Sequence, residues 1–296
     1  MEEVRRLLIE KERHFREFQI WPLSSRLDIR SWLENFDTAD TRLAVRLADC
    51  FVHIAEPLVE AMFVAAIQGL LDTLAARDKS KFGSLDTDSS VCFVCVEGEN
   101  PSATDSGHLF ARILRDKLGV PQANIQLPRQ AILLASQNTF TTFVFVDDFA
   151  GSGEQMRVTW TRPHKFGTTL LSFEVLAALM PGLNFAYCPA VCAPLAKTNL
   201  APYPRLQLSP AHELNPSDSL LDTNCAVWRG LNAGEGIDFI KRYGLRAGYT
   251  KDDQREDDWG GFNRQGLALS FHHGVPDATL PIFRSTRGGW QPLIRR

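Results

Sequence analysis

The feature that most restricts the fold of this 296-residue chain is the segment from Phe143 to Gln155. It opens with the apolar run Phe143–Val146, whose aromatic and β-branched residues are typical of a buried strand. Two acids, Asp147 and Asp148, follow that run directly. The small residues of Ala150–Gly153 then predict a tight loop, after which a helix is expected. A strand, a tight loop and a helix in this order favour a parallel α/β sheet.

Further apolar runs and helical patterns alternate from residue 90 onward. We expect strands at Val91–Val96, Ala131–Ser136, Phe140–Val146, Phe185–Ala193 and Leu267–Phe271, and helices at His108–Leu118, from Glu154 and at Glu235–Tyr243. Because strands that alternate with helices build parallel sheets, the predicted fold class is α/β, a mostly parallel sheet with flanking helices.

The first third of the chain has a different pattern. An amphipathic helix is expected over Val4–Phe18, and helical patterns continue over Asp28–Phe36 and Thr38–Leu71. The polar segment 77–90 has the composition of a connecting loop. We therefore predict a helical N-terminal region over 1–85 and an α/β domain over 86–296. The charged stretch Lys251–Asp258 is expected to be a solvated loop.

Composition and charge exclude several classes of protein. Hydrophobic residues make up 44%, and 32 basic against 35 acidic residues give a net charge of −3, so neither a disordered chain nor a strongly basic nucleic-acid binder is indicated. Six cysteines are too few for a disulfide scaffold. The apolar stretch Ala61–Leu71 is shorter than the roughly 20 residues of a membrane span. We predict a cytoplasmic protein with no membrane partner.

The central segment also indicates a chemistry. Small residues let backbone N–H groups approach a phosphate, the following helix N-terminus adds a favourable dipole, and Ser152 can donate its hydroxyl. Asp147 and Asp148 can accept hydrogen bonds from two sugar hydroxyls, or hold Mg²⁺ through water. A phosphate beside a diol describes a ribose 5-phosphate group.

This segment resembles the signature of type I phosphoribosyltransferases: an apolar strand, two acids, three mostly small residues, then Ser/Thr-Gly. The resemblance implies an enzyme that binds phosphoribosyl pyrophosphate or a nucleotide with Mg²⁺ as cofactor. The family usually has Gly-Thr where this chain has Glu154-Gln155. By position, the resemblance assigns the ribose and the metal to Asp147 and Asp148, and the 5-phosphate loop to Ala150, Gly151, Ser152, Gly153, Glu154 and Gln155.

The same family binds pyrophosphate between the first core strand and its helix. That place corresponds here to Glu97, Asp105, Ser106 and Gly107. Thr104 or Asp105 could equally cap the helix that follows. No Lys or Arg stands out as the cation for a diphosphate, although Arg112 and Arg115 are candidates.

Shorter motifs extend the resemblance over nearly the whole chain, to a bacterial phosphoribosyltransferase-like subfamily of anti-phage conflict effectors, some of them associated with retrons. These motifs are Trp32–Phe36, Val96–Glu99, Thr104–Gly107 and Phe271–Ile282. The resemblance implies an antiviral effector that has a protein partner, or a retron reverse transcriptase with its RNA–DNA, as its partner.

Two histidines and two alternative functions complete the hypotheses. His272 and His273 follow the last expected strand and could act as general acid and base. A second function is a catalytically inactive subunit that senses a nucleotide or docks a partner. A third is an S-adenosylmethionine-dependent methyltransferase, because Asp148–Gly153 also resembles the cofactor loop of amino-methyltransferases.

Overall fold

The computed structural model describes residues 2–23, 25–77, 90–98, 107–255 and 257–295. The chain forms two compact units. The terminal unit combines Met1–Val59 with Asn215–Arg296, and the central unit comprises Glu60–Leu214. This division differs from the predicted boundary after residue 85, because the N-terminal helices share one apolar core with the C-terminal third.

A parallel six-stranded sheet organises the central unit, which confirms the predicted fold class. Its order is β3-β2-β4-β7-β8, and β9 also pairs with β7. The strands are β2 (Val91–Cys95), β3 (Ile125–Gln126), β4 (Thr142–Ala150), β7 (Asn184–Cys192), β8 (Leu206–Leu208) and β9 (His212–Glu213).

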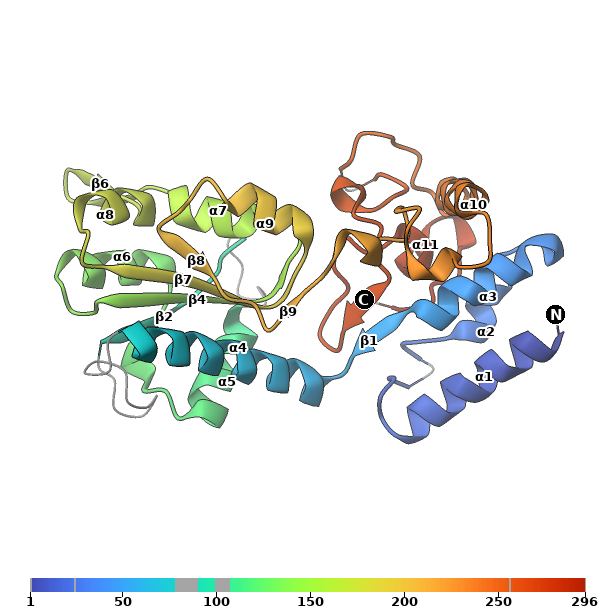
Figure 1. Cartoon of the computed structure of the whole chain (residues 1–296), viewed down its shortest axis with the longest axis horizontal. Coiled ribbons are helices and arrows are strands. Elements are labelled where there is room, and N and C mark those ends of the chain that lie inside the picture. Colours follow the sequence, from blue (N-terminus) through green and yellow to red (C-terminus); the bar gives the residue numbers. More distant parts are fainter. Residues whose placement is uncertain (1, 24, 78–89, 99–106, 256, 296) are drawn as a thin grey trace. The chain divides into compact units, whose positions relative to one another are not determined.

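Helices cover both faces of this sheet (Figure 1). On one face lie α4 (Glu56–Arg77) and α5 (Gly107–Leu118), and on the other lie α6 (Pro128–Ser136), α7 (Glu154–Thr161), α8 (Phe173–Leu179) and α9 (Pro194–Leu200). Phe143 and Phe145 of β4 pack with Trp160 and Phe173 on the second face. Because both faces are covered, the central strands are continuous apolar runs. A small antiparallel hairpin, β5 (His164–Phe166) and β6 (Thr169–Leu171), follows α7.

One predicted strand is wrong, because Ala131–Ser136 lies in helix α6. Pro128 occupies the first turn of that helix, where its missing N–H costs nothing. Ala131, Ile132 and Ala135 are buried at helical spacing. A short apolar run does not by itself distinguish a strand from one face of a helix.

The central predicted strand is longer than expected. β4 continues through the two acids to Ala150, so Asp147 and Asp148 lie within the strand and not after it. The cause is pairing with β7, in which Asp147 is opposite Pro189 and Ala150 is opposite Cys192. The strands expected at Val91–Val96 and Phe185–Ala193 are confirmed as β2 and β7.

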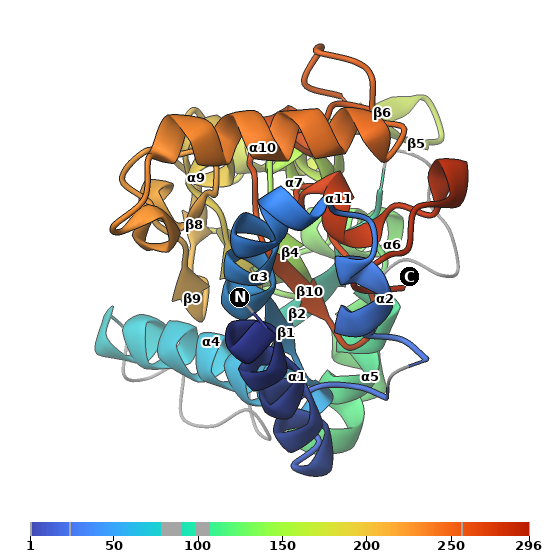
Figure 2. The same cartoon turned by 90° about the vertical axis from the view of Figure 1, so that its right-hand side faces the viewer.

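The terminal unit contains the helices of both chain ends and a parallel strand pair (Figure 2). Trp32 and Phe283 stack in its core at 5.6 Å between ring centroids, and Trp32 Nε1 donates to the Ile282 carbonyl. The elements are α1 (Glu2–Glu17), α2 (Ile29–Leu33), α3 (Thr41–Cys50), β1 (Val52–Ile54), α10 (Ala233–Arg246), β10 (Leu269–Phe271) and α11 (Pro281–Arg284). Short 3-10 turns lie in this unit at Thr38–Asp40, Pro216–Asp218, Ala226–Trp228, Phe262–Arg264 and Arg287–Gly289, and in the central unit at Gln122–Asn124.

Helix α4 extends on both sides of the apolar stretch Ala61–Leu71. Over Glu56–Leu74 its length and composition suffice for a membrane span, although the core helix of a soluble protein passes the same test. Its side chains Phe63, Ile67 and Leu70 are buried, and Phe63 meets Phe110 of α5 edge-on. Helix α4 therefore packs against α5 through this aromatic pair.

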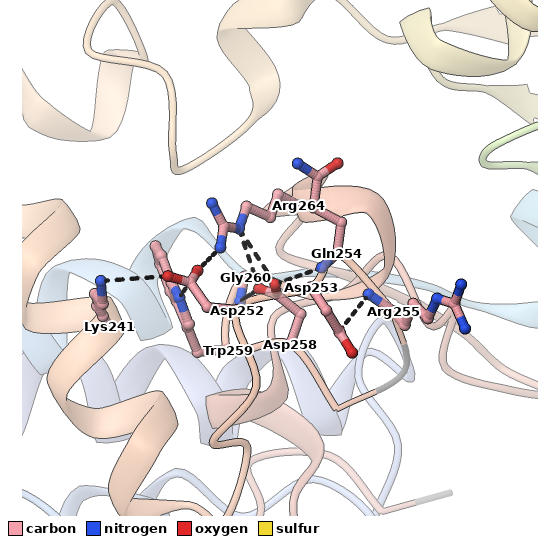
Figure 3. Close-up of polar contacts among 9 residues, drawn as sticks. All are labelled: Lys241, Asp252, Asp253, Gln254, Arg255, Asp258, Trp259, Gly260 and Arg264. Carbon is pink, nitrogen blue, oxygen red and sulfur yellow. Dashed lines mark hydrogen bonds and ion pairs between the residues drawn. The ribbon is translucent and has the colours of Figure 1, made fainter.

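The charged stretch Lys251–Asp258 is only partly a solvated loop (Figure 3). Residues 251–255 are exposed, but Asp258 is fully buried. Asp258 accepts hydrogen bonds from the backbone N–H groups of Gln254 at 2.7 Å and Gly260 at 2.8 Å, and it pairs with Arg264. Asp252 accepts from Trp259 Nε1 at 3.1 Å. This part of the charge cluster therefore has a structural role, because it closes a turn.

Candidate functional site

The order of the strands marks the carboxyl ends of β2 and β4 as the candidate ligand-binding region of the central unit. The chain passes from β2 to β3 on one side, then crosses to β4 on the other side of β2. Connections therefore diverge between the carboxyl ends of β2 and β4, and such a switch point is where open parallel sheets bind ligands. The predicted site residues Glu97 and Asp147–Gln155 follow or end these two strands.

The predicted pyrophosphate segment is only partly described. Asp105 and Ser106, like the alternative cap Thr104, lie outside the described residues. Gly107 is the first residue of α5. Of the two candidate cations on α5, Arg112 is exposed, and Arg115 pairs with its neighbour Asp116 on the surface.

Asp147 is a buried acid with partners on both oxygens. Only 1% of its surface is exposed. Tyr187 Oη of β7 donates to Asp147 Oδ2 at 2.9 Å, and the Asp148 backbone N–H donates to Oδ1 at 3.0 Å. Burial above all, and the neighbouring Asp148 charge, raise the pKa of Asp147 well above its ordinary value. Burial thus shifts Asp147 toward its neutral form, in contrast to an ordinary surface aspartate.

Asp148 has a different environment from its neighbour. It is half-buried, and its Oδ1 accepts from the Phe149 backbone N–H at 2.8 Å. Solvent reaches Asp148 but hardly reaches Asp147. The two adjacent acids are therefore unequal, and Asp148 is the better placed to contact a ligand.

The predicted phosphate loop is held by its own turn and by helix α9. Gly153 has the left-handed angle φ +75°, and the Glu154 N–H donates to Ser152 Oγ at 3.3 Å. A Cβ at Gly153 would lie 3.1 Å from Leu200 Cγ, so glycine allows α9 to approach. Asn199 Nδ2 of α9 donates to the Ser152 carbonyl at 3.0 Å.

The residues that depart from the family pattern begin helix α7. Arg157 Nε donates to Glu154 Oε2 at 2.8 Å, and this hydrogen bond lowers the pKa of Glu154. Since a second contact joins the same two side chains, the guanidinium largely offsets the carboxylate. Gln155 is exposed. Glu154 thus places no uncompensated charge beside the loop.

Helix α7 also fixes the start of the segment after β2. Thr159 is buried, and its Oγ1 accepts from the Glu97 N–H at 3.3 Å and donates to the Glu97 carbonyl at 3.1 Å. Arg162 Nη1 pairs with Glu97 Oε2 at 3.3 Å, and Nη2 donates to the Gly98 carbonyl at 2.8 Å. Glu97 is thereby tied to the helix that follows the phosphate loop.

Sequence reasoning missed Tyr187, Thr159 and Arg162. Tyr187 lies opposite Phe145, two residues before Asp147, so its contact depends on strand register. Thr159 and Arg162 carry no local motif. They come into contact with Glu97 and Gly98 only because the end of α7 packs beside the start of the segment that follows β2.

The predicted acid–base histidines belong to the terminal unit, whereas the two acids belong to the central unit. His272 and His273 follow β10, and their Nδ1 atoms are 3.4 Å apart. Nearby, His53 Nδ1 contacts Ser270 Oγ at 2.9 Å. Burial first, then the charges of Arg26 and His272, lower the pKa of His53 to about 4.

Protein side chains alone do not form a metal centre in the described part of the chain. Among those residues, no group of three or more His, Cys, Asp or Glu side chains is arranged to hold a metal ion. Cys92 and Cys95 are both buried within β2.

Comparison with known proteins gives one match. A family model described as PRTase-CE matches residues 29–296, about nine tenths of the chain. No curated protein and no solved structure matches.

Proposed function

The chain belongs to the PRTase-CE family, a phosphoribosyltransferase-like family, and from this premise we propose that the region at the carboxyl ends of β2 and β4 binds a ribose 5-phosphate group. The ligand would be phosphoribosyl pyrophosphate or a ribonucleotide. One observation carries the proposal: a half-buried carboxylate, Asp148, and a glycine loop at a helix N-terminus end the same strand at the switch point of the sheet.

The two halves of this site suit the two ends of the ligand. Backbone N–H groups of Gly151–Gly153 and the first turn of α7 favour a phosphate. Asp148 can accept hydrogen bonds from ribose hydroxyls, because this residue is only partly buried. Asp147 is held within the sheet by its hydrogen bond from Tyr187, and burial shifts it toward its neutral form, so it would position the neighbouring Asp148 without contacting the ligand.

In the proposed reaction, the bond between C1 of the ribose and the diphosphate oxygen breaks, and the diphosphate leaves with the electron pair. A nucleophilic acceptor forms a bond to C1 and loses its proton. The developing charge on the ribose resembles an oxocarbenium ion, so fixed dipoles and charges around the sugar and the diphosphate supply most of the catalysis.

Mg²⁺ fits this site as an ion carried by the substrate. Mg²⁺ usually keeps several waters and binds through one or two carboxylates together with substrate phosphates. Asp148 can supply such a carboxylate, whereas Asp147 is buried and hydrogen-bonded on both oxygens. When bound, Mg²⁺ would neutralise charge on the diphosphate.

A second candidate function is a nucleotide sensor without turnover. The burial of Asp147 supports this alternative, because it leaves Asp148 as the one of the two acids that is within reach of a ribose. The family match favours either function over a methyltransferase.

The proposed biological role is that of an effector in antiviral defence. The support is the resemblance of Trp32–Phe36 and Phe271–Ile282 to retron-associated conflict effectors. An effector of this kind would alter a nucleotide pool during infection. Loss of phage protection in cells that carry Asp148→Asn, with equal protein levels, would support this role; unchanged protection would contradict it.

Calorimetric titration of phosphoribosyl pyrophosphate, with and without Mg²⁺, tests the site. We expect Mg²⁺-dependent binding that Asp148→Asn weakens about tenfold or more, since hydrogen bonds to charged groups contribute roughly 1.5–3 kcal/mol. Asp116→Asn, the same change at an exposed acid of α5, is the control and should bind as wild type does.

The outcomes separate the candidate functions. Release of pyrophosphate with at least one base of a panel identifies an enzyme, whereas binding without release identifies a sensor. If folded wild type does not bind the ligand, the ribose-phosphate proposal is wrong, and S-adenosylmethionine becomes the next ligand to titrate.

A further inference from the structure

A diphosphate at the carboxyl ends of β2 and β4 would need a cationic side chain close by, and the sequence pattern does not indicate which one. The described residues around the switch point include the partly exposed acids Glu97 and Asp148, besides the buried Asp147. Like charges repel a polyanion unless a cation is close. Arg162 contacts the described start of the segment following β2, at Glu97 and Gly98.

The position of Arg162 is fixed on two sides. Its Nη1 lies 3.3 Å from Glu97 Oε2, and its Nη2 donates to the Gly98 carbonyl at 2.8 Å. The side chains of Arg162 and Glu97 are 22% and 18% exposed, so both are partly screened but reachable from solvent. The N–H groups of a planar guanidinium match phosphate oxygens, and Nη1 is the atom that an anion replacing the Glu97 carboxylate would meet.

The ion pair is not needed to hold the Glu97 backbone. Thr159 already satisfies both the N–H and the carbonyl of Glu97. Thr159 is fully buried, so this anchor stands apart from the charged side chains. The Thr159 anchor therefore does not depend on the carboxylate of Glu97.

We infer that Arg162 binds the diphosphate group of the ligand, and that Glu97 is the counter-ion which the diphosphate displaces. This inference rests on the proposed function for the identity of the ligand. In the empty site Glu97 pairs with Nη1 of the guanidinium; in the occupied site phosphate oxygens take the place of this carboxylate. Glu97 then acts against binding, in contrast to the direct pyrophosphate contact implied by the family resemblance.

Titration of inorganic pyrophosphate into the full chain, with and without Mg²⁺, tests the assignment. Arg162→Ala should weaken binding about 30-fold or more, because truncating a partly desolvated charged partner has a large effect. Arg162→Lys, which keeps the charge but loses the fork, should fall between wild type and Arg162→Ala. Lys117→Ala removes one exposed cation of α5 and should bind as wild type does.

Glu97→Gln separates this role from a purely structural one. If Glu97 is a displaced counter-ion, Glu97→Gln should bind pyrophosphate at least about threefold tighter. If the ion pair only braces the segment, or if Glu97 holds the metal, the same variant should bind more weakly. Weaker binding by Glu97→Gln, or unchanged binding by Arg162→Ala, would overturn the inference.

Ribose 5-phosphate, titrated in parallel, distinguishes this inference from the proposed function. If pyrophosphate binding depends on Arg162 but neither ribose 5-phosphate nor phosphoribosyl pyrophosphate binds, the role of Arg162 is supported and the proposed function is contradicted. If phosphoribosyl pyrophosphate binds wild type and Arg162→Ala equally well, the proposed function is supported and the role of Arg162 is contradicted.

Discussion

Replacing Gly153 by alanine tests the geometry of the phosphate loop directly. Gly153 has φ +75°, a conformation that costs an L-residue roughly 1–2 kcal/mol. The new Cβ would lie 3.3 Å from Ala196 Cα and 3.1 Å from Leu200 Cγ. Leu200 can rotate, but the backbone of α9 must shift by a few tenths of an ångström. Together these effects should destabilise the central unit by about 1–3 kcal/mol.

Gly182→Ala is the matched control. No atom lies within 4 Å of a Cβ at Gly182, and its φ is not in the left-handed region. The same chemical change there should leave stability unchanged, or raise it by up to about 1 kcal/mol through the unfolded chain. The difference between the two variants isolates the geometry of Gly153 from the general effect of removing a glycine.

Urea denaturation followed by circular dichroism measures this difference. With a slope of about 1–3 kcal/mol per molar urea, Gly153→Ala should unfold at a midpoint lower by roughly 1 M. It should also weaken binding of phosphoribosyl pyrophosphate, because Gly153 precedes the first turn of α7. Equal midpoints for Gly153→Ala and Gly182→Ala would refute the left-handed turn and its close approach to α9.

Three further predictions concern buried polar groups. Burial lowers the pKa of His53 to about 4 from the ordinary 6.5, so the folded state binds fewer protons than the unfolded state between these values. The free energy of unfolding should therefore fall by up to about 3 kcal/mol as the pH drops from 6.5 to 4. The stabilities of wild type and His53→Gln should diverge over this pH range, and a parallel pH dependence of the two proteins would contradict the prediction. Tyr187→Phe removes the donor to Asp147 and should destabilise by about 1–3 kcal/mol, seen as a lower urea midpoint; an unchanged midpoint would argue against that hydrogen bond. Asp258→Asn breaks a buried charge pair and should destabilise the protein by about 3–5 kcal/mol in thermal or urea unfolding. The control Asp253→Asn changes an exposed acid and should have little effect on stability. Similar losses of stability in both variants would contradict the structural role of the buried Asp258.

Local patterns predicted the central elements because each pattern expresses a local physical preference. Continuous apolar runs at 91–96 and 185–193 became β2 and β7, since strands covered on both faces need apolar side chains throughout. The loop before α7 was predictable for the same reason, because glycine at residue 153 permits a backbone angle that other residues avoid.

Elements defined by distant partners were not predictable in this way. Val52–Ile54 is a strand only because it pairs with Leu269–Phe271, more than 200 residues away. The run Ala131–Ser136 became a helix because its buried residues fit one helical face against the sheet. Short segments carry too little local preference to decide between these outcomes.

The sequence by itself determined that two acids and a glycine loop end one strand of an α/β sheet, because these residues are neighbours in the chain. Only the tertiary structure decided that the acids are unequal. The register of β4 and β7 brings Tyr187 to Asp147 and buries it, while Asp148 stays within reach of solvent. The path of α7 likewise brings Arg162 to Glu97. Contacts between separate strands and helices depend on how whole elements pack, and no local pattern records that packing.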